Sequence, residues 1–324
     1  MKKLQNLAKA LVAVCLVGMV SCSDDDDNNS PNLKTIAETA QANAELSSLV
    51  AALDRAGLVS TLDGNGDFTV FAPTNAAFNS FLSANGFASV DEVPVPVLRE
   101  VLLNHVIVGS KTSSELSTGY LKTQAKGSAS ATNTLSMFVN TSGGVTLNGG
   151  TSNGGATVTT ANIEASNGVV HVVNGVIGLP TVVNHAIANP DFSNLVAALT
   201  RDDQPDFVGI LGGTGPFTVF APNNAAFGSL LSELSLGGLN DVPQAVLENT
   251  LKYHVVAGAN VLSSTLTNNQ MVSTFLGQSF TVQLPNTGAQ ILDANDRVSK
   301  IIATDVQASN GVIHAIDKVI LPAL

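Results

Sequence analysis

The chain has 324 residues, of which 44% are apolar and 12% are charged, a composition suited to folded cores and too poorly charged for a disordered protein. Its 14 basic and 25 acidic residues give a formal net charge of −11, which argues against a nucleic-acid partner because phosphate contacts need clustered lysine and arginine. The two cysteines, Cys15 and Cys22, both lie near the N-terminus, which excludes a disulfide framework and a cysteine-based metal site.

Residues 1–21 have the pattern of an export signal. Three lysines precede an apolar run at 10–20 that is too short to span a bilayer as a helix. The run closes on Met19-Val20-Ser21-Cys22, which resembles a bacterial lipoprotein processing site with cleavage before Cys22 and lipid on its sulfur. A plain secretory signal is the alternative. We predict a signal peptide at 1–21 and lipidation of Cys22.

Residues 22–32 form an acidic, polar segment without periodicity, which we expect to be a flexible tether. Ser23 followed by four aspartates is similar to the surface-export signal of Bacteroidota lipoproteins. This similarity implies a protein anchored by lipid in the outer membrane and facing the extracellular side. A solvated spacer is the simpler interpretation, and the two are compatible.

The rest of the chain contains one unit written twice. Residues 68–78 return at 217–227 with a single change, residues 102–109 return in related form at 251–258, and residues 165–171 return at 308–314. The blocks keep their order and nearly their spacing, as tandem domains with different loop lengths do. We predict one domain at 33–180 and a second at 181–324, with the boundary near Leu179-Pro180-Thr181.

Within the first copy the patterns predict helices and strands in alternation. Apolar residues at 46, 49, 50 and 53 favour an amphipathic helix, and 68–71 is a β-prone run that Pro73 ends. Thr74 or Asn75 can cap a short helix, and Pro94 and Pro96 precede another in which Val97, Val101 and His105 share a face. Turn residues through 118–160 indicate β-hairpins, and 169–177 is typical of a buried strand after the turn Asn167-Gly168. Each copy is therefore expected to be an α+β domain.

Two motifs connect the copies to a known family. Phe-Thr-Val-Phe-Ala-Pro-Thr/Asn-Asn-Ala-Ala-Phe and Ala-Ser-Asn-Gly-Val-Val/Ile-His resemble the two signature blocks of fasciclin (FAS1) domains, in both copies and in the family's order. The resemblance implies a β-sandwich-like wedge with short flanking helices in each copy. It also implies the family's usual role, extracellular adhesion or matrix association through protein or glycan contacts.

Four of the five histidines form repeat-matched pairs, His105 with His254 and His171 with His314. His171 and His314 lie in apolar strands, and we interpret them as structural; the same interpretation is open for His105 at the end of an apolar helix. No carboxylate or histidine cluster with metal-ligand spacing surrounds either pair, so we predict no metal and no cofactor. We expect His185, which has no match in the first copy, at the surface near the joint between the domains.

Tyr253 and His254 are the best candidates for direct binding. Fasciclin domains have a Tyr-His pair linked to adhesion, and Tyr253-His254-Val255-Val256 matches that pattern. The first copy has Asn104 in place of the tyrosine, so the resemblance applies to the second domain, with His105 as the matched residue in the first. Packing in the core is the alternative for all three side chains.

The sequence contains none of the motifs that catalysis requires in recognisable form, so we do not predict an enzyme. Asp63-Gly64-Asn65-Gly66-Asp67 spaces oxygens like a calcium loop but lacks the glycine and glutamate that such a loop needs, which favours a turn. We predict a surface-anchored adhesion protein that binds an extracellular protein or glycan. The alternatives are a carrier or receptor for a small ligand, with a pocket within or between the domains, and a passive spacer in the cell envelope.

Overall fold

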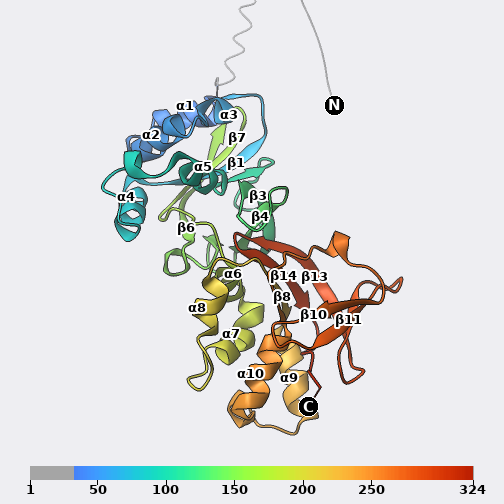
Figure 1. Ribbon diagram of the computed structural model, residues 1–324. Helices are drawn as coiled ribbons and strands as arrows, with labels where there is room; N and C mark the ends of the chain where they lie inside the picture. Colours follow the sequence, from blue (N-terminus) through green and yellow to red (C-terminus); the bar gives the residue numbers. More distant parts are fainter. Residues whose placement is uncertain (1–32, 324) are drawn as a thin grey trace, which may run out of the picture. The chain divides into compact units, whose positions relative to one another are not determined.

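Each repeat folds into a group of helices packed against a seven-stranded sheet, as the computed structural model shows (Figure 1). The structure describes residues 33–323. The predicted signal peptide, Cys22, the tether and Leu324 lie outside the described residues.

The first repeat begins with short helices and ends with a series of antiparallel strands. Its elements are α1 (Ile36–Gln41), η1 (Ala44–Leu46), α2 (Ser47–Arg55), α3 (Val59–Asp63), β1 (Phe68–Pro73), α4 (Asn75–Ala84), η2 (Val90–Glu92), α5 (Val95–Leu103), β2 (Val106–Val108), β3 (Gly119–Lys126), β4 (Thr134–Asn140), β5 (Thr146–Leu147), η3 (Thr151–Asn153), β6 (Ala156–Ala165) and β7 (Gly168–Val173).

The second repeat has the same order of α-helices and strands, and differs in the position of one short 3-10 helix, η6 in place of η3. Its elements are α6 (Val182–Ala188), η4 (Pro190–Phe192), α7 (Ser193–Leu199), α8 (Phe207–Gly212), β8 (Phe217–Pro222), α9 (Asn224–Glu233), η5 (Leu239–Asp241), α10 (Gln244–Tyr253), β9 (Val255–Ala257), η6 (Ser263–Thr265), β10 (Gln270–Ser273), β11 (Ser279–Gln283), β12 (Gln290–Leu292), β13 (Val298–Ala308) and β14 (Gly311–Ile316).

The two sheets have the same topology, which confirms the duplication. Their strand orders are β2-β1-β7-β6-β5-β4-β3 and β10-β11-β12-β13-β14-β8-β9. In each, the first signature strand pairs in parallel with the last, Phe68 opposite Gly168 and Phe217 opposite Gly311. The two signature blocks are therefore adjacent interior strands, second and third from one edge of each sheet.

Each sheet carries a core on both faces. In β1, Val70 and Ala72 belong to the core formed with the helices, whereas Phe71 belongs to a second core with Met137 and Val139 of β4. Successive side chains of a strand point to opposite faces, so the far half of the sheet folds back over β1 and β7. The second domain repeats this arrangement, with Ala221 facing the helices and Phe220 facing β11. The predicted α+β fold with a β-sandwich and flanking helices is confirmed.

Polar side chains fix the helices to the signature strands. Thr74 caps α4 by accepting a hydrogen bond from the Ala77 N–H at 3.2 Å, as predicted, and Asn223 does the same for α9. The Asn167 side chain does more than make a turn. It accepts from the Ile36 N–H at 2.9 Å and donates to the Leu62 carbonyl at 2.8 Å, so it joins the start of α1 to the end of α3.

One predicted helix face is wrong in detail. Helix α5 ends at Leu103, so His105 follows the helix instead of lying on it. Leu98, Val101 and Leu102 point into the core, whereas the predicted Val97 is 47% exposed. The reason is that Leu98, Val101 and Leu102, spaced i, i+3 and i+4, form the buried stripe of the helix, and Val97 lies at its edge.

The two repeats contact each other directly within residues 33–323. The Lys122 ammonium donates to the Asp305 carbonyl at 2.7 Å and to the Ser136 hydroxyl at 3.0 Å. That same hydroxyl accepts from the Gln307 N–H at 3.0 Å, so β4 of the first repeat is bonded to β13 of the second. Ser136 and Gln307 are both buried, which makes this contact part of the interior.

Candidate functional site

His105 and His254 use both ring nitrogens to hold their own domain together. His105 Nδ1 lies 2.8 Å from the Val101 carbonyl, which can only accept, and Nε2 lies 2.9 Å from the Ile177 N–H, which can only donate. His254 repeats this geometry with Thr250 and Ile320. These partners require a neutral ring protonated on Nδ1. Burial lowers the pKa of both histidines to about 4.

His171 and His314 form a second repeated arrangement with the other tautomer. His171 Nε2 lies 2.9 Å from the Lys111 carbonyl, and Nδ1 accepts from the Asn162 N–H at 3.2 Å. His314 has the same relation to the Val261 carbonyl and the Asp305 N–H. Burial also lowers the pKa of each ring. The geometry is that of side chains that connect strands.

Tyr253 lies in the core of the second domain. Its side chain is buried, its hydroxyl donates to the Ser279 carbonyl at 2.9 Å, and its ring meets Phe280 edge-on with 6.1 Å between centroids. At the matched position the Asn104 amide donates to the Gly178 carbonyl at 2.8 Å. The side chains of Tyr253, His254 and His105 therefore all point into the core, which is where the packing alternative places them. A ligand on the outer surface does not reach these side chains in this conformation.

His185 is buried, so the prediction that it lies at the surface is wrong. It projects from α6 against Tyr120 of the first domain, with ring centroids 5.6 Å apart. Burial lowers the pKa of His185 to about 4; the nearby Gln307 backbone acts in the opposite direction and the Lys122 charge in the same direction. Neither ring nitrogen makes a hydrogen bond of normal geometry among the described residues, the Gln307 backbone included. The joint between the domains is therefore packed closely enough at this point to bury the His185 side chain, which we expected at the surface.

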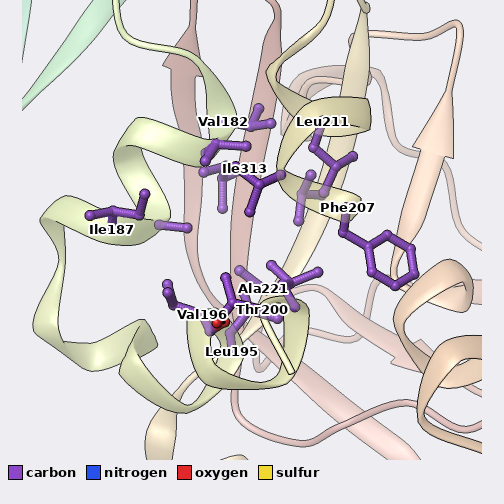
Figure 2. Close-up of a pocket in the computed structure, with 14 residues that line it drawn as sticks. Val182, Ile187, Leu195, Val196, Thr200, Phe207, Leu211, Ala221 and Ile313 are labelled. Atoms are coloured by element: carbon purple, nitrogen blue, oxygen red, sulfur yellow. The ribbon is translucent and has the colours of Figure 1, made fainter. Parts of the chain in front are cut away.

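The exposed feature that stands out in the second domain is an apolar surface over α6, α7 and α8, which we call the α6–α8 face. It is formed by Val183, Ile187, Val196 and Val208, of which Ile187 is 48% and Val208 is 38% exposed. Figure 2 shows Ile187 on α6, Val196 and Thr200 on α7 and Phe207 on α8 around a shallow hollow. The hollow has a cavity volume of about 30 Å³, room for about one water molecule.

The first domain is less apolar than the α6–α8 face, mainly at one position. Asn167 and Asn310 make the same bonds in the two copies, which aligns Ile36 with Val182 and Leu62 with Leu211. On that alignment Ile187 corresponds to Gln41 and Val183 to the smaller Ala37, whereas Val196 and Val208 correspond to valines, Val50 and Val59; Thr200, beside the face, corresponds to Asp54. Sequence analysis missed this difference. The signal was present, because Val183 and Ile187 form a second apolar stripe beside the core residues Val182 and Ala186.

A larger hollow lies between the domains. It has a volume of about 480 Å³ and is lined on one side by Tyr120 and Asn140 and on the other by Asn189, Asp191 and residues of β13. It is within the size range of small-molecule sites and mixes apolar with polar groups. Among the described residues, this is a place between the domains where the small-ligand alternative would apply.

Two further searches concern residues 33–323. No group of three or more histidine, cysteine, aspartate or glutamate side chains in that range is placed to hold a metal ion. No helix in the same range combines the length and apolarity needed to cross a bilayer. Asp63, from the segment that resembles a calcium loop, ends α3 and accepts a hydrogen bond from the Thr35 hydroxyl at 2.7 Å.

A comparison with protein families matches the fasciclin domain model twice, over residues 44–180 and 190–322. The chain belongs to the fasciclin domain family. The two fasciclin domains correspond to the two repeats, and the family's signature blocks are the pair of parallel strands in each sheet.

Relatives of this fasciclin chain come from bacteria and animals. Protein sll1483 of Synechocystis is 38% identical over 146 residues, 44% of this chain and 74% of that protein. Human periostin is 30% identical over 277 residues, and pig transforming growth factor-beta-induced protein ig-h3 is 29% identical over 264. Those matches cover 83% and 81% of this chain but only 30% and 35% of the two animal proteins.

One solved structure, a FAS1 domain pair from the insect cell adhesion molecule Fasciclin I, aligns with this chain at a TM-score of 0.49 and 21% identity. The alignment covers 85% of this chain and 92% of the insect one.

Proposed function

We propose that this protein is a two-domain adhesion lipoprotein that binds an extracellular protein, with the α6–α8 face of the second domain as a contact surface. The observation that carries the proposal is that the exposed Ile187 at the middle of this apolar face is replaced by Gln41 in the other fasciclin domain, with Ala37 in place of Val183 and Asp54 in place of Thr200. The helix is kept in both copies, so packing alone does not require Ile187 to be apolar.

The chemistry of the face favours a protein over a glycan. Its residues are branched aliphatics, with Thr200 as the one hydroxyl among those around the hollow. Glycans need converging hydrogen-bond groups, whereas aliphatic faces bury the apolar side chains of a protein partner. A glycan remains the alternative partner, and the binding assay below separates the two.

The membrane anchor is the second part of the proposal. Cys22 would carry the lipid, and the acidic segment to residue 32 would hold the domains away from the outer membrane on its extracellular side. Mass spectrometry of the N-terminal peptide should find acylated Cys22. An unmodified chain that starts elsewhere would contradict the anchor without affecting the binding surface.

The binding surface is tested by giving the second domain the residues of the first. The triple variant Val183→Ala, Ile187→Gln, Thr200→Asp should lose at least about fivefold in binding to matrix-protein arrays, because the apolar area available to the partner is reduced. Its unfolding midpoint should stay close to wild type, since the first copy folds with alanine, glutamine and aspartate at these positions. Thr61→Ala, at an exposed position on α3 of the first domain, serves as the matched control.

Unchanged protein binding by the triple variant would reject the face as the contact surface. Signals on glycan arrays that the variant does not reduce would move the assignment to a glycan site elsewhere. The carrier alternative is favoured by the hollow between the domains and predicts that a small molecule protects Tyr120 and Asn189 from solvent exchange. Wild-type silence in all these assays would favour the passive spacer.

A further inference from the structure

The first domain contains an open groove that the second domain lacks. It lies between α4, α5 and the segment after β7, and its volume is about 820 Å³. Phe81, Phe87, Val97, Val101 and Val176 form its apolar lining. Every residue that lines it is uncharged, so it offers no counter-charge to an ionic ligand.

In the second domain, side chains fill most of the equivalent region. Between α9, α10 and the segment after β14, the remaining cavity is about 30 Å³. The duplicated blocks match the linings of the two places residue by residue: Phe81 with Leu230, Asn85 with Leu234, Val97 with Val246, Val101 with Thr250, Val176 with Val319 and Gly178 with Leu321.

Leu321 is one source of the difference; the other is the segment at η3, whose Thr151, Gly154 and Gly155 line the groove of the first domain and have no match in the second-domain lining. It lines the second-domain cavity and packs against that domain's helical core. Its backbone is fixed by a bond from the Leu321 N–H to the Asp293 carboxylate at 2.9 Å and by the Asn295 amide, which donates to the Leu321 carbonyl at 3.1 Å. The side chain therefore enters the groove from an extended, anchored segment.

Gly178 holds the matched position in the first domain. Its N–H donates to the Gly154 carbonyl at 2.9 Å and its carbonyl accepts from Asn104, so the backbone is anchored in the same way. With no side chain on Gly178, the space that Leu321 fills in the other copy stays open. The second domain thus shows what kind of group covers this surface.

We propose that the groove of the first domain binds a leucine or similar aliphatic side chain on an extended segment of a partner protein, in the way that Leu321 occupies the second domain. The uncharged apolar lining selects an aliphatic anchor. Ser80, Asn85 and Asn174 among the lining residues each make one hydrogen bond within the domain, and the Ser80 oxygen, the Asn85 carbonyl oxygen and the Asn174 amide nitrogen keep capacity for a peptide backbone. This site is separate from the α6–α8 face and does not depend on it.

The test fills the groove from within. A Cβ built on Gly178 meets only the Gly154 carbonyl oxygen, at 3.6 Å, and Gly178 does not need the left-handed conformation, so Gly178→Leu is compatible with the fold. The probe is a fluorescent peptide with the sequence of residues 317–323, Asp-Lys-Val-Ile-Leu-Pro-Ala, and a second peptide has aspartate at the place of Leu321. Both are titrated against the full chain in lipid nanodiscs by fluorescence anisotropy.

We expect saturable binding of the leucine peptide, at least tenfold weaker binding of the aspartate peptide, and at least tenfold weaker binding to Gly178→Leu. Gly178→Ala should lose less than threefold, since a methyl group fills little of the groove. Circular dichroism melting of both variants should match wild type, which shows that lost binding is not lost folding.

Three results would overturn the proposal. Equal binding by wild type and Gly178→Leu would place the peptide elsewhere. No saturable binding up to about 1 mM, across peptides with leucine, isoleucine, phenylalanine or methionine as the anchor, would mean that the groove has no such ligand. A wild-type dimer that Gly178→Leu dissociates would make the occupant a second copy of this chain.

Discussion

The residues that carry the family signature serve the fold through bonds between distant parts of the chain. His105 joins the end of α5 to the segment after β7, a separation of 72 residues, and Asn167 reaches Ile36 across 131 residues. Sequence reasoning identified the repeated histidines and the Asn-Gly turn because both recur at fixed spacing. It could not identify the partners, because no local pattern records which carbonyl faces a ring nitrogen.

Tyr253 shows the same limit of sequence reasoning, here for a residue that was predicted to bind a ligand. Its position beside His254 marked it as a candidate for binding, but its hydroxyl bonds to Ser279, on a strand whose position depends on the whole sheet. A Tyr-His pair in sequence is equally compatible with an exposed and a buried tyrosine. Only the folded-back sheet decides between them.

The buried histidines predict a loss of stability in acid. The pKa of His105, His185 and His254 is about 4 in the folded protein and about 6.5 when unfolded. Between these values the unfolded chain binds protons that the folded chain does not, so stability is complete above pH 6.5 and decreases as the pH falls toward 4. Each histidine should contribute a loss of about 3 kcal/mol.

Urea unfolding at pH 7.5, 5.5 and 4.5 measures this dependence. His185→Leu should be at least as stable as wild type at pH 7.5, because it removes ring nitrogens that are buried without partners. It should also lose less stability than wild type on acidification. An identical pH dependence in the variant would show that His185 titrates normally.

At the scale of elements, the parallel pairing of β1 with β7 is the centre of the domain and depends on a glycine. Gly168 has a φ of 146°, and a Cβ there would lie 1.9 Å from the Phe68 carbonyl oxygen. Gly311 has the same close approach to Phe217, at 2.1 Å. The sequence identified the turn from Asn-Gly, but the tight approach of the two signature strands becomes evident only from their register.

Gly168→Ala should therefore destabilise the first domain by about 3 kcal/mol or more, because both the backbone conformation and the strand spacing must change. Gly143→Ala is the matched control, since Gly143 is exposed and a Cβ there meets nothing within 4 Å. Chemical denaturation of the two variants provides the comparison. A loss of less than about 1 kcal/mol in Gly168→Ala would mean that the strands can separate at little cost.

At the scale of the whole described chain, the repeats are joined by polar and aromatic contacts that neither repeat needs for its own fold. Tyr120 of the first domain packs against the core of the second, and Lys122 and Ser136 bond to β13. The short connection after Leu179 predicted two adjoining domains but not the contact surface between them. The reason is that the contact residues differ from those at the matched positions of the other copy, and His185, matched by Thr39, is the clearest case.

These contacts predict that the two domains unfold as one cooperative unit. We expect a single substitution, at Gly127, to remove this cooperativity. A Cβ on Gly127 would lie 2.4 Å from the Ser309 Cα, so Gly127→Ala must push the turn after β13 and the 127–129 segment apart and break the bond from the Ala129 N–H to the Ser309 carbonyl. Scanning calorimetry should show one transition for wild type and two for the variant, because each domain retains its own core but loses its neighbour. If both proteins gave the same single transition, the coupling would have to come from elsewhere. If both gave two, the domains would act as independent binding units, and avidity on a surface would depend on the linker alone.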